Sequence, residues 1–146
     1  MRIIGGTHRG KKLHVPEDQH TRPTTDRIRE NIFNILTHGF EVTFSGLRVL
    51  DLFAGTGALG IEALSRGAQS AIFVDQHGPA YALLKKNTAP FKNAVVLNQN
   101  ALDLMIAPHQ RFQLIFMDPP YDQHLVSKAL DALIAQNYLN PDCLIV

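Results

Sequence analysis

Apolar residues have no regular spacing at the start of the chain and a clear helical spacing immediately afterwards. Residues 1–24 contain Gly, Pro and Thr without a period, which predicts an irregular arm or a small hairpin. Over 26–38 the apolar positions recur every three or four residues, as in an amphipathic helix whose first N–H groups Thr25 or Asp26 can cap. Arg29 falls outside the apolar face. The residues expected to meet the core are Ile28, Ile32, Ile35 and Leu36.

Later in the chain, short apolar runs alternate with amphipathic segments. The apolar runs predict strands at 48–54, 70–75, 94–98, 113–118 and 143–146. The segments between them predict helices at 58–67, 79–89 and 124–137, with a weak helix near 102–107. Strands separated by single helices pair in parallel through crossover connections. The fold class is therefore α/β, an open and mainly parallel Rossmann-like sheet, and ligands of such sheets bind beyond the carboxyl ends of the strands.

The length of 146 residues fits a single domain, in which residues 25–146 form the Rossmann-like core. The apparent strand at 143–146 coincides with the last residues of the sequence, so we expect a core truncated at its C-terminus with one sheet edge open. No apolar stretch approaches the roughly 20 residues that span a bilayer, and the N-terminus lacks the apolar run of a secretory signal. With a single cysteine, Cys143, these features predict a cytoplasmic protein without membrane contact.

Charge is distributed unevenly along the chain. Residues 1–30 carry seven Lys or Arg and four Asp or Glu, whereas the whole chain has 14 and 13. The first cations have no acidic neighbour; they are Arg2, Arg9, Lys11 and Lys12. A basic segment on a nearly neutral body favours contact with a polyanion such as nucleic acid, and the alternative is a solvated terminus.

A glycine-rich loop follows the strand at 48–54. Gly55, Gly57 and Gly60 form the pattern GxGxxG between a strand and a helix, where glycine allows a tight turn and lets a ligand approach the backbone. The same spacing serves dinucleotides, and Asp75 lies 20 residues after Gly55, where an acid binds ribose hydroxyls. A carboxylate ahead of the glycines, Asp51, would crowd a pyrophosphate and suits a ligand with an ammonium group. These residues predict a cofactor site and favour S-adenosylmethionine over NAD.

The run Asp118-Pro119-Pro120-Tyr121 ends the strand at 113–118 and is the most specific feature of the chain. Two prolines lack N–H donors and fix φ, so the turn is stiff and its carbonyls need outside partners. The Asp118 carboxylate and a proline carbonyl can accept both hydrogen bonds of an amino group on a planar ring, and Tyr121 can stack on that ring. Two such acceptors can draw the amino nitrogen towards tetrahedral geometry, which frees its lone pair to attack a methyl donor.

With these motifs the sequence resembles the bacterial RsmD family, which methylates the N2 of a guanine in small-subunit ribosomal RNA. The resemblance rests on D-L-F-A-G-T-G-A-L-G-I-E-A-L-S-R-G-A at 51–68 and D-P-P-Y at 118–121. It extends to M-R-I-I-G-G-x-x-R-G-K-K-L at the start and R-P-T-T-D-R-I-R-E at 22–30, and so covers essentially the whole chain. It implies the fold of class I S-adenosylmethionine-dependent methyltransferases, S-adenosylmethionine as the cofactor and guanine N2 as the methyl acceptor.

The resemblance also implies roles for individual residues. The cofactor would be bound by Asp51, Phe53, Ala54, Gly55, Thr56, Gly57, Asp75, Gln76, Asn100, Ala101 and Asp118. The catalytic residues would be Asp118, Pro119, Pro120 and Tyr121. The RNA substrate would be bound by Arg2, Arg9, Lys11, Lys12, Arg22, Thr24, Thr25 and Tyr121. Asn100 stands where the family usually has an acidic residue that accepts from the adenine amino group, and an amide oxygen can also accept that hydrogen bond.

The implied partner is ribosomal RNA, either free or within a small ribosomal subunit or an assembly intermediate, and we expect a monomer. The seven histidines lack metal-ligand spacing, so no metal site is predicted. Three other functions remain open. They are an adenine-N6 methyltransferase acting on DNA or RNA, a catalytically silent RNA-binding domain, and an NAD(P)-dependent oxidoreductase, which gives no role to Asp118–Tyr121.

Overall fold

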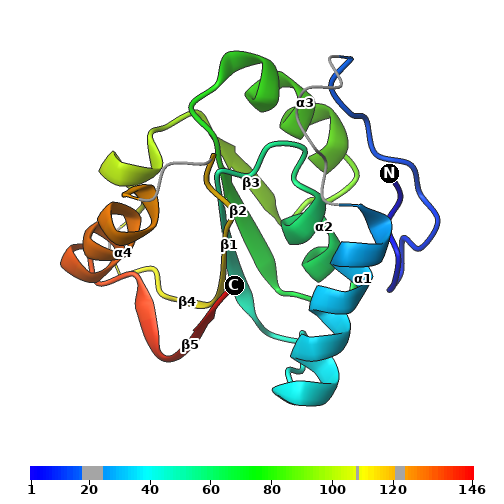
Figure 1. The fold of residues 1–146 in the computed structure, drawn as a ribbon, viewed down its shortest axis with the longest axis horizontal. Coiled ribbons are helices and arrows are strands. Elements are labelled where there is room, and N and C mark those ends of the chain that lie inside the picture. Colours follow the sequence, from blue (N-terminus) through cyan, green and yellow to red (C-terminus); the bar gives the residue numbers. More distant parts are fainter. Residues whose placement is uncertain (18–24, 108, 121–123) are drawn as a thin grey trace.

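A parallel sheet runs through the centre of the molecule in the computed structural model, which describes residues 1–17, 25–107, 109–120 and 124–146 (Figure 1). Its five strands pair in the order β3-β2-β1-β4-β5, and each neighbouring pair is parallel. The strands are β1 (Arg48–Leu52), β2 (Ser70–Val74), β3 (Ala94–Leu97), β4 (Phe112–Met117) and β5 (Leu139–Ile145). This order confirms the predicted α/β class with an open, parallel, Rossmann-like sheet.

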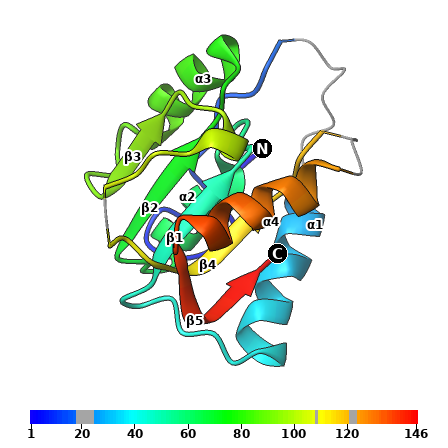
Figure 2. The same cartoon turned by 90° about the vertical axis from the view of Figure 1, so that its left-hand side faces the viewer.

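Helices connect the strands across both faces of the sheet. The crossovers are α2 (Ala58–Ser65) after β1, α3 (Gly78–Thr88) after β2 and α4 (Leu125–Ala135) after β4, while the short 3₁₀ turn η2 (Ala101–Asp103) stands at the predicted weak helix. Figures 1 and 2 show α2 and α3 on one face and α4 across the other. The chain adds strands outward from β1 to β3 and then returns to pair β4 with β1. The direction in which successive strands are added to the sheet therefore reverses between β1 and β4. The carboxyl ends of these two parallel strands lie side by side there.

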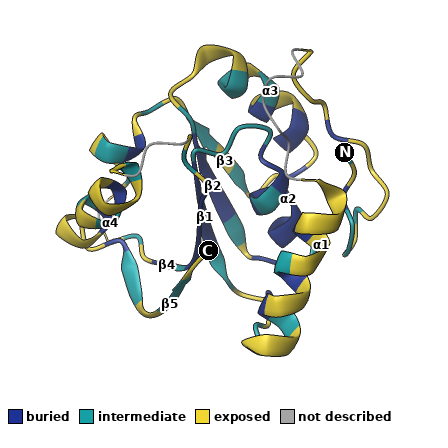
Figure 3. Ribbon diagram, viewed as in Figure 1, coloured by how far each residue is buried: buried dark blue, intermediate teal, exposed yellow. Residues whose placement is uncertain are grey.

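The core has two layers, one on each face of the sheet, because successive strand residues point to opposite sides. Val49 packs in one apolar cluster with Phe33 and Ile61, whereas its neighbour Leu50 packs in the other cluster with Leu133 of α4. Figure 3 shows the buried residues gathered along the strands and the inner sides of the helices. Burial on both faces explains why β1, β2 and β4 appear in the sequence as continuous apolar runs, whereas β3 and β5 are partly exposed.

The helix expected at 26–38 forms as α1 (Asp26–Asn34) and continues into a π-helical turn, η1 (Ile35–Gly39). Thr25 caps it, since its Oγ1 accepts a hydrogen bond from the Ile28 N–H at 3.3 Å. The expected apolar face is wrong at two positions, because Ile28 and Ile35 are 52% and 58% exposed. Leu36 is buried as expected.

The face that α1 turns to the core carries Arg29 and Phe33, both fully buried. Apolar periodicity assigned Arg29 to the outside, but a guanidinium can be buried when a carboxylate neutralises it. The Arg29 Nε lies 3.8 Å from the carboxylate of Glu62 on α2, and its Nη2 donates to the Arg2 carbonyl and to Asp26. Arg29 therefore belongs to an ion-pair network between the helices.

Residues 1–13 form a hairpin that docks on α2. Arg2 and Lys12 form an antiparallel bridge, and the Ile3 N–H donates to the Lys11 carbonyl at 2.9 Å. Ile3 and Leu13 are buried in the core, so the hairpin is held by apolar contacts as well as by hydrogen bonds. The basic segment of the sequence is thus part of the folded body.

The carboxylate of Glu62 joins the hairpin to the helices. It is almost completely buried and accepts hydrogen bonds from the N–H groups of Ile4 and Gly5, each at 2.8 Å. It also forms ion pairs with Arg29 at 3.8 Å and Arg66 at 2.9 Å. A buried carboxylate is stable only when its oxygens are satisfied in this way.

We predict that Glu62→Ala lowers the free energy of unfolding by about 3–5 kcal/mol, because it removes the buried carboxylate beside Arg29 and leaves the N–H groups of Ile4 and Gly5 without their acceptor. Urea denaturation measures the effect. The matched control is Glu30→Ala on the exposed side of α1, which should change stability by less than about 0.5 kcal/mol. Equal losses in the two variants would contradict the role assigned to Glu62.

Candidate active site

A pocket opens where the carboxyl ends of β1 and β4 meet. In the sheet register Leu52 pairs with Met117, so the loops that follow these two residues begin side by side. The pocket is lined by Asp51, Phe53, Ala54, Thr56, Ala58, Leu59 and Asp118. The structure therefore brings the predicted glycine loop and the predicted Asp118 to one cavity, together with the first residues of α2, which the sequence did not indicate.

The glycine loop turns sharply between β1 and α2. Gly55 and Gly57 have φ values of 56° and 78°, which favour glycine, and Phe53 adopts 56° as well. A Cβ on Gly57 would lie 2.7 Å from Leu84, and one on Gly60 would lie 2.4 Å from Phe73. A Cβ on Gly55, in contrast, would have no atom within 4 Å. Gly57 and Gly60 are thus required by packing, while Gly55 leaves its side of the loop open to a ligand.

Asp51 caps helix α2 from the preceding strand. The N-cap residue of α2 is Gly57, which has no side chain to accept a hydrogen bond from the free N–H groups of the first turn. The Oδ2 atom of Asp51 accepts from the Gly60 N–H at 2.9 Å instead. A carboxylate at a helix N-terminus also interacts favourably with the positive end of the helix dipole.

Burial raises the pKa of Asp51 to about 8 from the ordinary value of 3.8. The hydrogen bond from Gly60 opposes this shift, and the nearby carboxylates of Asp118 and Asp75 increase it. Three carboxyl groups therefore surround the glycine loop. Such a set repels a pyrophosphate and attracts a ligand that carries positive charge, because a cation beside Asp51 favours its ionised form. The carboxyl oxygens can accept hydrogen bonds from the ammonium group of S-adenosylmethionine, and their negative charge suits its sulfonium.

Asp75 follows β2 and holds the glycine loop from the other side. Its Oδ2 accepts from the Gly55 N–H and its Oδ1 from the His77 N–H, both at 2.9 Å. A carboxylate can accept about four hydrogen bonds, so each oxygen of Asp75 retains capacity for a ligand hydroxyl. Asp75 is not among the pocket-lining residues, but its bond to Gly55 joins it to the loop that forms the pocket. Gln76, beside it, is exposed.

The residues after β3 lie near the end of β2. Asn98 donates from its Nδ2 to the Asp75 carbonyl at 3.0 Å, a contact that sequence reasoning missed. The side chain of Asn100 accepts from the Leu102 N–H at 2.9 Å and thereby caps η2. Ala101 is buried in the cluster beneath α4. Asn100 and Ala101, both predicted to bind the cofactor, do not line the pocket that contains Asp51 and Asp118.

Of the predicted catalytic run, the structure describes Asp118, Pro119 and Pro120. Asp118 and Pro120 are exposed and Pro119 is partly buried, and of these three only Asp118 lines the pocket. Tyr121 lies outside the described residues, as do the predicted RNA-binding residues Arg22 and Thr24.

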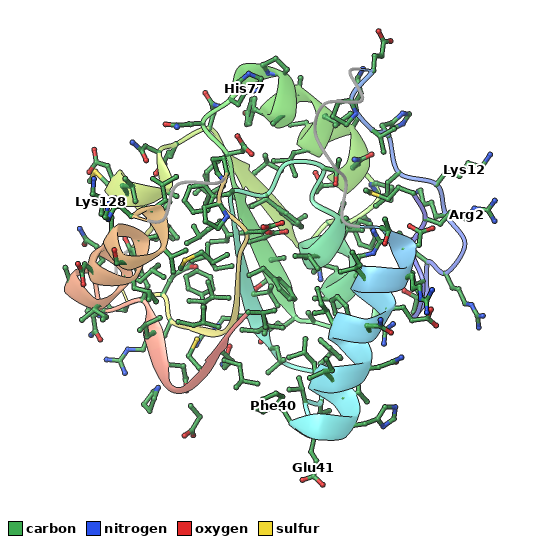
Figure 4. The ribbon with its side chains drawn as sticks, viewed as in Figure 1. Arg2, Lys12, Phe40, Glu41, His77 and Lys128 are labelled. Atoms are coloured by element: carbon green, nitrogen blue, oxygen red, sulfur yellow. The ribbon has the colours of Figure 1, made fainter. Side chains whose placement is uncertain are left out.

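The other predicted RNA-binding residues lie at the surface. The four cations of the hairpin are exposed, and Arg2 and Lys12 point away from the body of the protein (Figure 4). Thr25 is exposed too, and its hydroxyl is the N-cap of α1. The hairpin is adjacent to the glycine loop, since the Thr56 hydroxyl lies 3.6 Å from the sulfur of Met1.

Neither a metal-binding cluster nor a membrane-spanning helix is found among the residues that the structure describes. No cluster of three or more His, Cys, Asp or Glu side chains is arranged there to hold a metal ion. No helix among these residues is both long and apolar enough to cross a membrane.

The sheet order and the glycine loop beside β4 define the class I methyltransferase fold. The solved structure of the Escherichia coli protein yhhF matches 99% of this chain and 78% of its own with a TM-score of 0.86 and 39% identity. A crystal structure described as that of a putative RNA methyltransferase from Pyrococcus horikoshii shares the fold, at 22% identity and a TM-score of 0.65 over 88% of this chain and 62% of its own.

The family is identified by sequence. Residues 1–146 match the family model described as conserved hypothetical protein 95. Ribosomal RNA small subunit methyltransferase D of Escherichia coli strain K12 is 40% identical over 99% of this chain and 72% of its own length. The enzyme of the same name from Haemophilus influenzae is 38% identical over 99% of this chain and 76% of its own. The chain belongs to this family, the RsmD family.

The buried carboxyl of Asp51 makes stability depend on pH in a defined direction. Between its ordinary pKa of 3.8 and its folded pKa of about 8, the unfolded chain loses this proton while the folded chain keeps it. The contribution of Asp51 to the free energy of unfolding is therefore highest below 3.8 and falls as the pH rises to about 8.

We predict that Asp51→Asn flattens this decline and stabilises the ligand-free protein at pH 8–9. The amide still accepts from Gly60 but has no charge to bury. Urea denaturation from pH 5 to 9 measures the difference between variant and wild type. Asp131→Asn, on an exposed position of α4, is the control. A constant difference between Asp51→Asn and wild type across this range would show that the carboxyl does not titrate as described.

Proposed function

We propose that this protein transfers a methyl group from S-adenosylmethionine to the N2 amino group of a guanine in small-subunit ribosomal RNA. The observation that carries the proposal is the shared pocket in which Asp118 faces the glycine loop and Asp51. Both relatives named ribosomal RNA small subunit methyltransferase D cover essentially this entire chain, which supports RNA as the substrate class.

The chain's own residues account for cofactor binding. Asp51 would hold the ammonium group of the methionine part, and the open backbone at Gly55 would let that part approach closely. Asp75 would accept from the ribose hydroxyls, a role that suits an acid at the end of β2. The acidic pocket disfavours the pyrophosphate of NAD(P), which argues against an oxidoreductase. When bound, S-adenosylmethionine supplies an electrophilic methyl group on a sulfonium centre.

Asp118 and the prolines after it would hold the target base. The Asp118 carboxylate and a proline carbonyl would accept the two N–H bonds of the amino group, and Asp118 is free at the pocket rim to do so. These acceptors would orient the nitrogen lone pair towards the cofactor side of the pocket. Most of the rate enhancement then arises from positioning and electrostatics rather than from covalent chemistry of the protein. The predicted stacking of Tyr121 on the base belongs to the same proposal.

The hairpin would bind the RNA backbone. Its exposed cations lie on a segment that is fixed to α2 and touches the glycine loop through Met1. RNA held there would therefore approach the pocket from the hairpin side. A ribosomal substrate, free or within a small subunit or assembly intermediate, would also place the protein in the cytoplasm.

The test is transfer of labelled methyl from S-adenosylmethionine to naked small-subunit ribosomal RNA, to small subunits that lack the modification, and to duplex DNA. We expect label on guanine N2 of the ribosomal RNA. Label on adenine would overturn the base assignment, and cofactor binding without transfer to any substrate would favour a silent RNA-binding domain.

In the same assay, Asp118→Ala should reduce transfer to background while the affinity for S-adenosylhomocysteine stays within about tenfold of wild type. The reason is that this substitution removes an acceptor for the base and leaves Asp51 and Asp75 intact. A variant that retains the full rate would exclude Asp118 from the mechanism.

Replacing Arg9, Lys11 and Lys12 together by alanine should flatten the salt dependence of RNA binding. Each lost phosphate contact reduces the slope of log affinity against log salt by about 0.7 for single strands and about 0.9 for duplexes. Lys128→Ala, on α4 across the sheet, is the control (Figure 4). An unchanged slope in the triple variant would assign RNA binding to another surface.

A further inference from the structure

A buried amide on α3 bridges the glycine loop and the N-terminal segment. Asn87 is only 4% exposed and is one of three buried residues of α3, with Leu84 and Thr88. Its Oδ1 accepts from the His14 N–H at 2.8 Å, and its Nδ2 donates to the His14 carbonyl at 3.0 Å. The same Nδ2 donates to the Thr56 carbonyl at 2.9 Å. Both N–H bonds of the amide are therefore used, and they connect three segments distant in sequence.

The contact with Thr56 fixes one peptide of the glycine loop. A peptide unit is planar, so its carbonyl and the following N–H have a fixed relative direction. The Thr56 carbonyl is bound by Asn87, and the Gly57 N–H donates to the Ala54 carbonyl at 2.7 Å. This peptide is thus held at both ends. Restraint matters at this position because glycine tolerates φ of either sign and would otherwise allow the peptide to rotate.

The restrained peptide belongs to the pocket wall. Thr56 and Ala54 both line the pocket, and Gly55 between them presents open backbone. The hydroxyl of Thr56 lies 3.6 Å from the sulfur of Met1. The conformation of the loop is therefore set partly from outside, by α3 and by the N-terminal segment.

We propose that Asn87 is a positioning residue for the cofactor, which holds the glycine loop in its binding conformation through the Thr56 carbonyl. The inference rests on the proposed function, because it concerns the cofactor of that reaction. Asn87 touches neither the cofactor nor the base in this account, and it acts through Thr56.

The experiment compares Asn87→Ala and Asn87→Ser with a matched control on the same helix. Thr88 is the next residue, is also buried, and its hydroxyl donates only within α3, to the Leu84 carbonyl at 2.7 Å. Thr88→Val thus removes a buried hydrogen bond of similar length without a link to the loop. Calorimetry with S-adenosylhomocysteine gives the affinity, and thermal unfolding gives the stability of each variant.

We expect Asn87→Ala to weaken binding of S-adenosylhomocysteine at least tenfold, with an intermediate loss for Asn87→Ser, which keeps one donor. In the transfer assay, KM for S-adenosylmethionine should rise while kcat changes less than threefold, because the lost restraint affects binding before the reaction. Thr88→Val should lose thermal stability and bind within twofold of wild type. Asn87→Ser is the milder change and serves if Asn87→Ala does not fold.

Variants of Asn87 that lose stability as Thr88→Val does, but bind as the wild type, would overturn the inference and leave the proposed function intact. A wild-type chain that binds neither S-adenosylhomocysteine nor S-adenosylmethionine would instead contradict the proposed function itself, and the inference with it.

Discussion

The arrangement of the N-terminal half depends on the burial of one carboxylate, that of Glu62. A carboxylate removed from water must have its lone pairs satisfied, and here two backbone N–H groups and two guanidinium groups do so. These partners come from the hairpin, from α1 and from Arg66, the residue that directly follows α2. The requirement to satisfy one charge therefore fixes three segments relative to one another, and α2, which carries the carboxylate, also begins at the glycine loop.

A second dependence connects packing to electrostatics in the pocket. Gly57 has a φ of 78°, and a Cβ there would lie 2.7 Å from Leu84 on α3, so α2 begins with a glycine that cannot cap it. Asp51 provides the missing acceptor from β1, but only from a buried position where ionisation is unfavourable. A close helix-to-loop contact thus leads to a carboxyl with a raised pKa. Among the described residues, the pocket lining includes the carboxyl groups of Asp51 and Asp118 and no basic side chain, which suits a positively charged ligand.

The sequence predicted those parts of the structure that depend on local patterns. The first four strands were identified within two residues from their apolar runs, whereas β5 begins four residues earlier than predicted because Asn140, Pro141 and Asp142 interrupt the apolar pattern. Motifs identified five of the pocket-lining residues. The sequence did not predict the burial of polar side chains whose partners lie far away along the chain. Arg29 is buried because Glu62 lies opposite, and Asn87 is buried because His14 and Thr56 meet it. Neither partner can be recognised from residue type or spacing.

The docking of the hairpin on α2 also has a consequence for how the protein folds during synthesis. Ile4 emerges from the ribosome long before its acceptor Glu62, which lies 58 residues further along. At about 5–20 residues per second, that interval lasts roughly 3–12 s. During this time the basic hairpin segment has no folded surface on which to dock. The hairpin can therefore reach its final position only after α2 has been synthesised, so the first segment of the chain is among the last parts of the N-terminal half to become fixed.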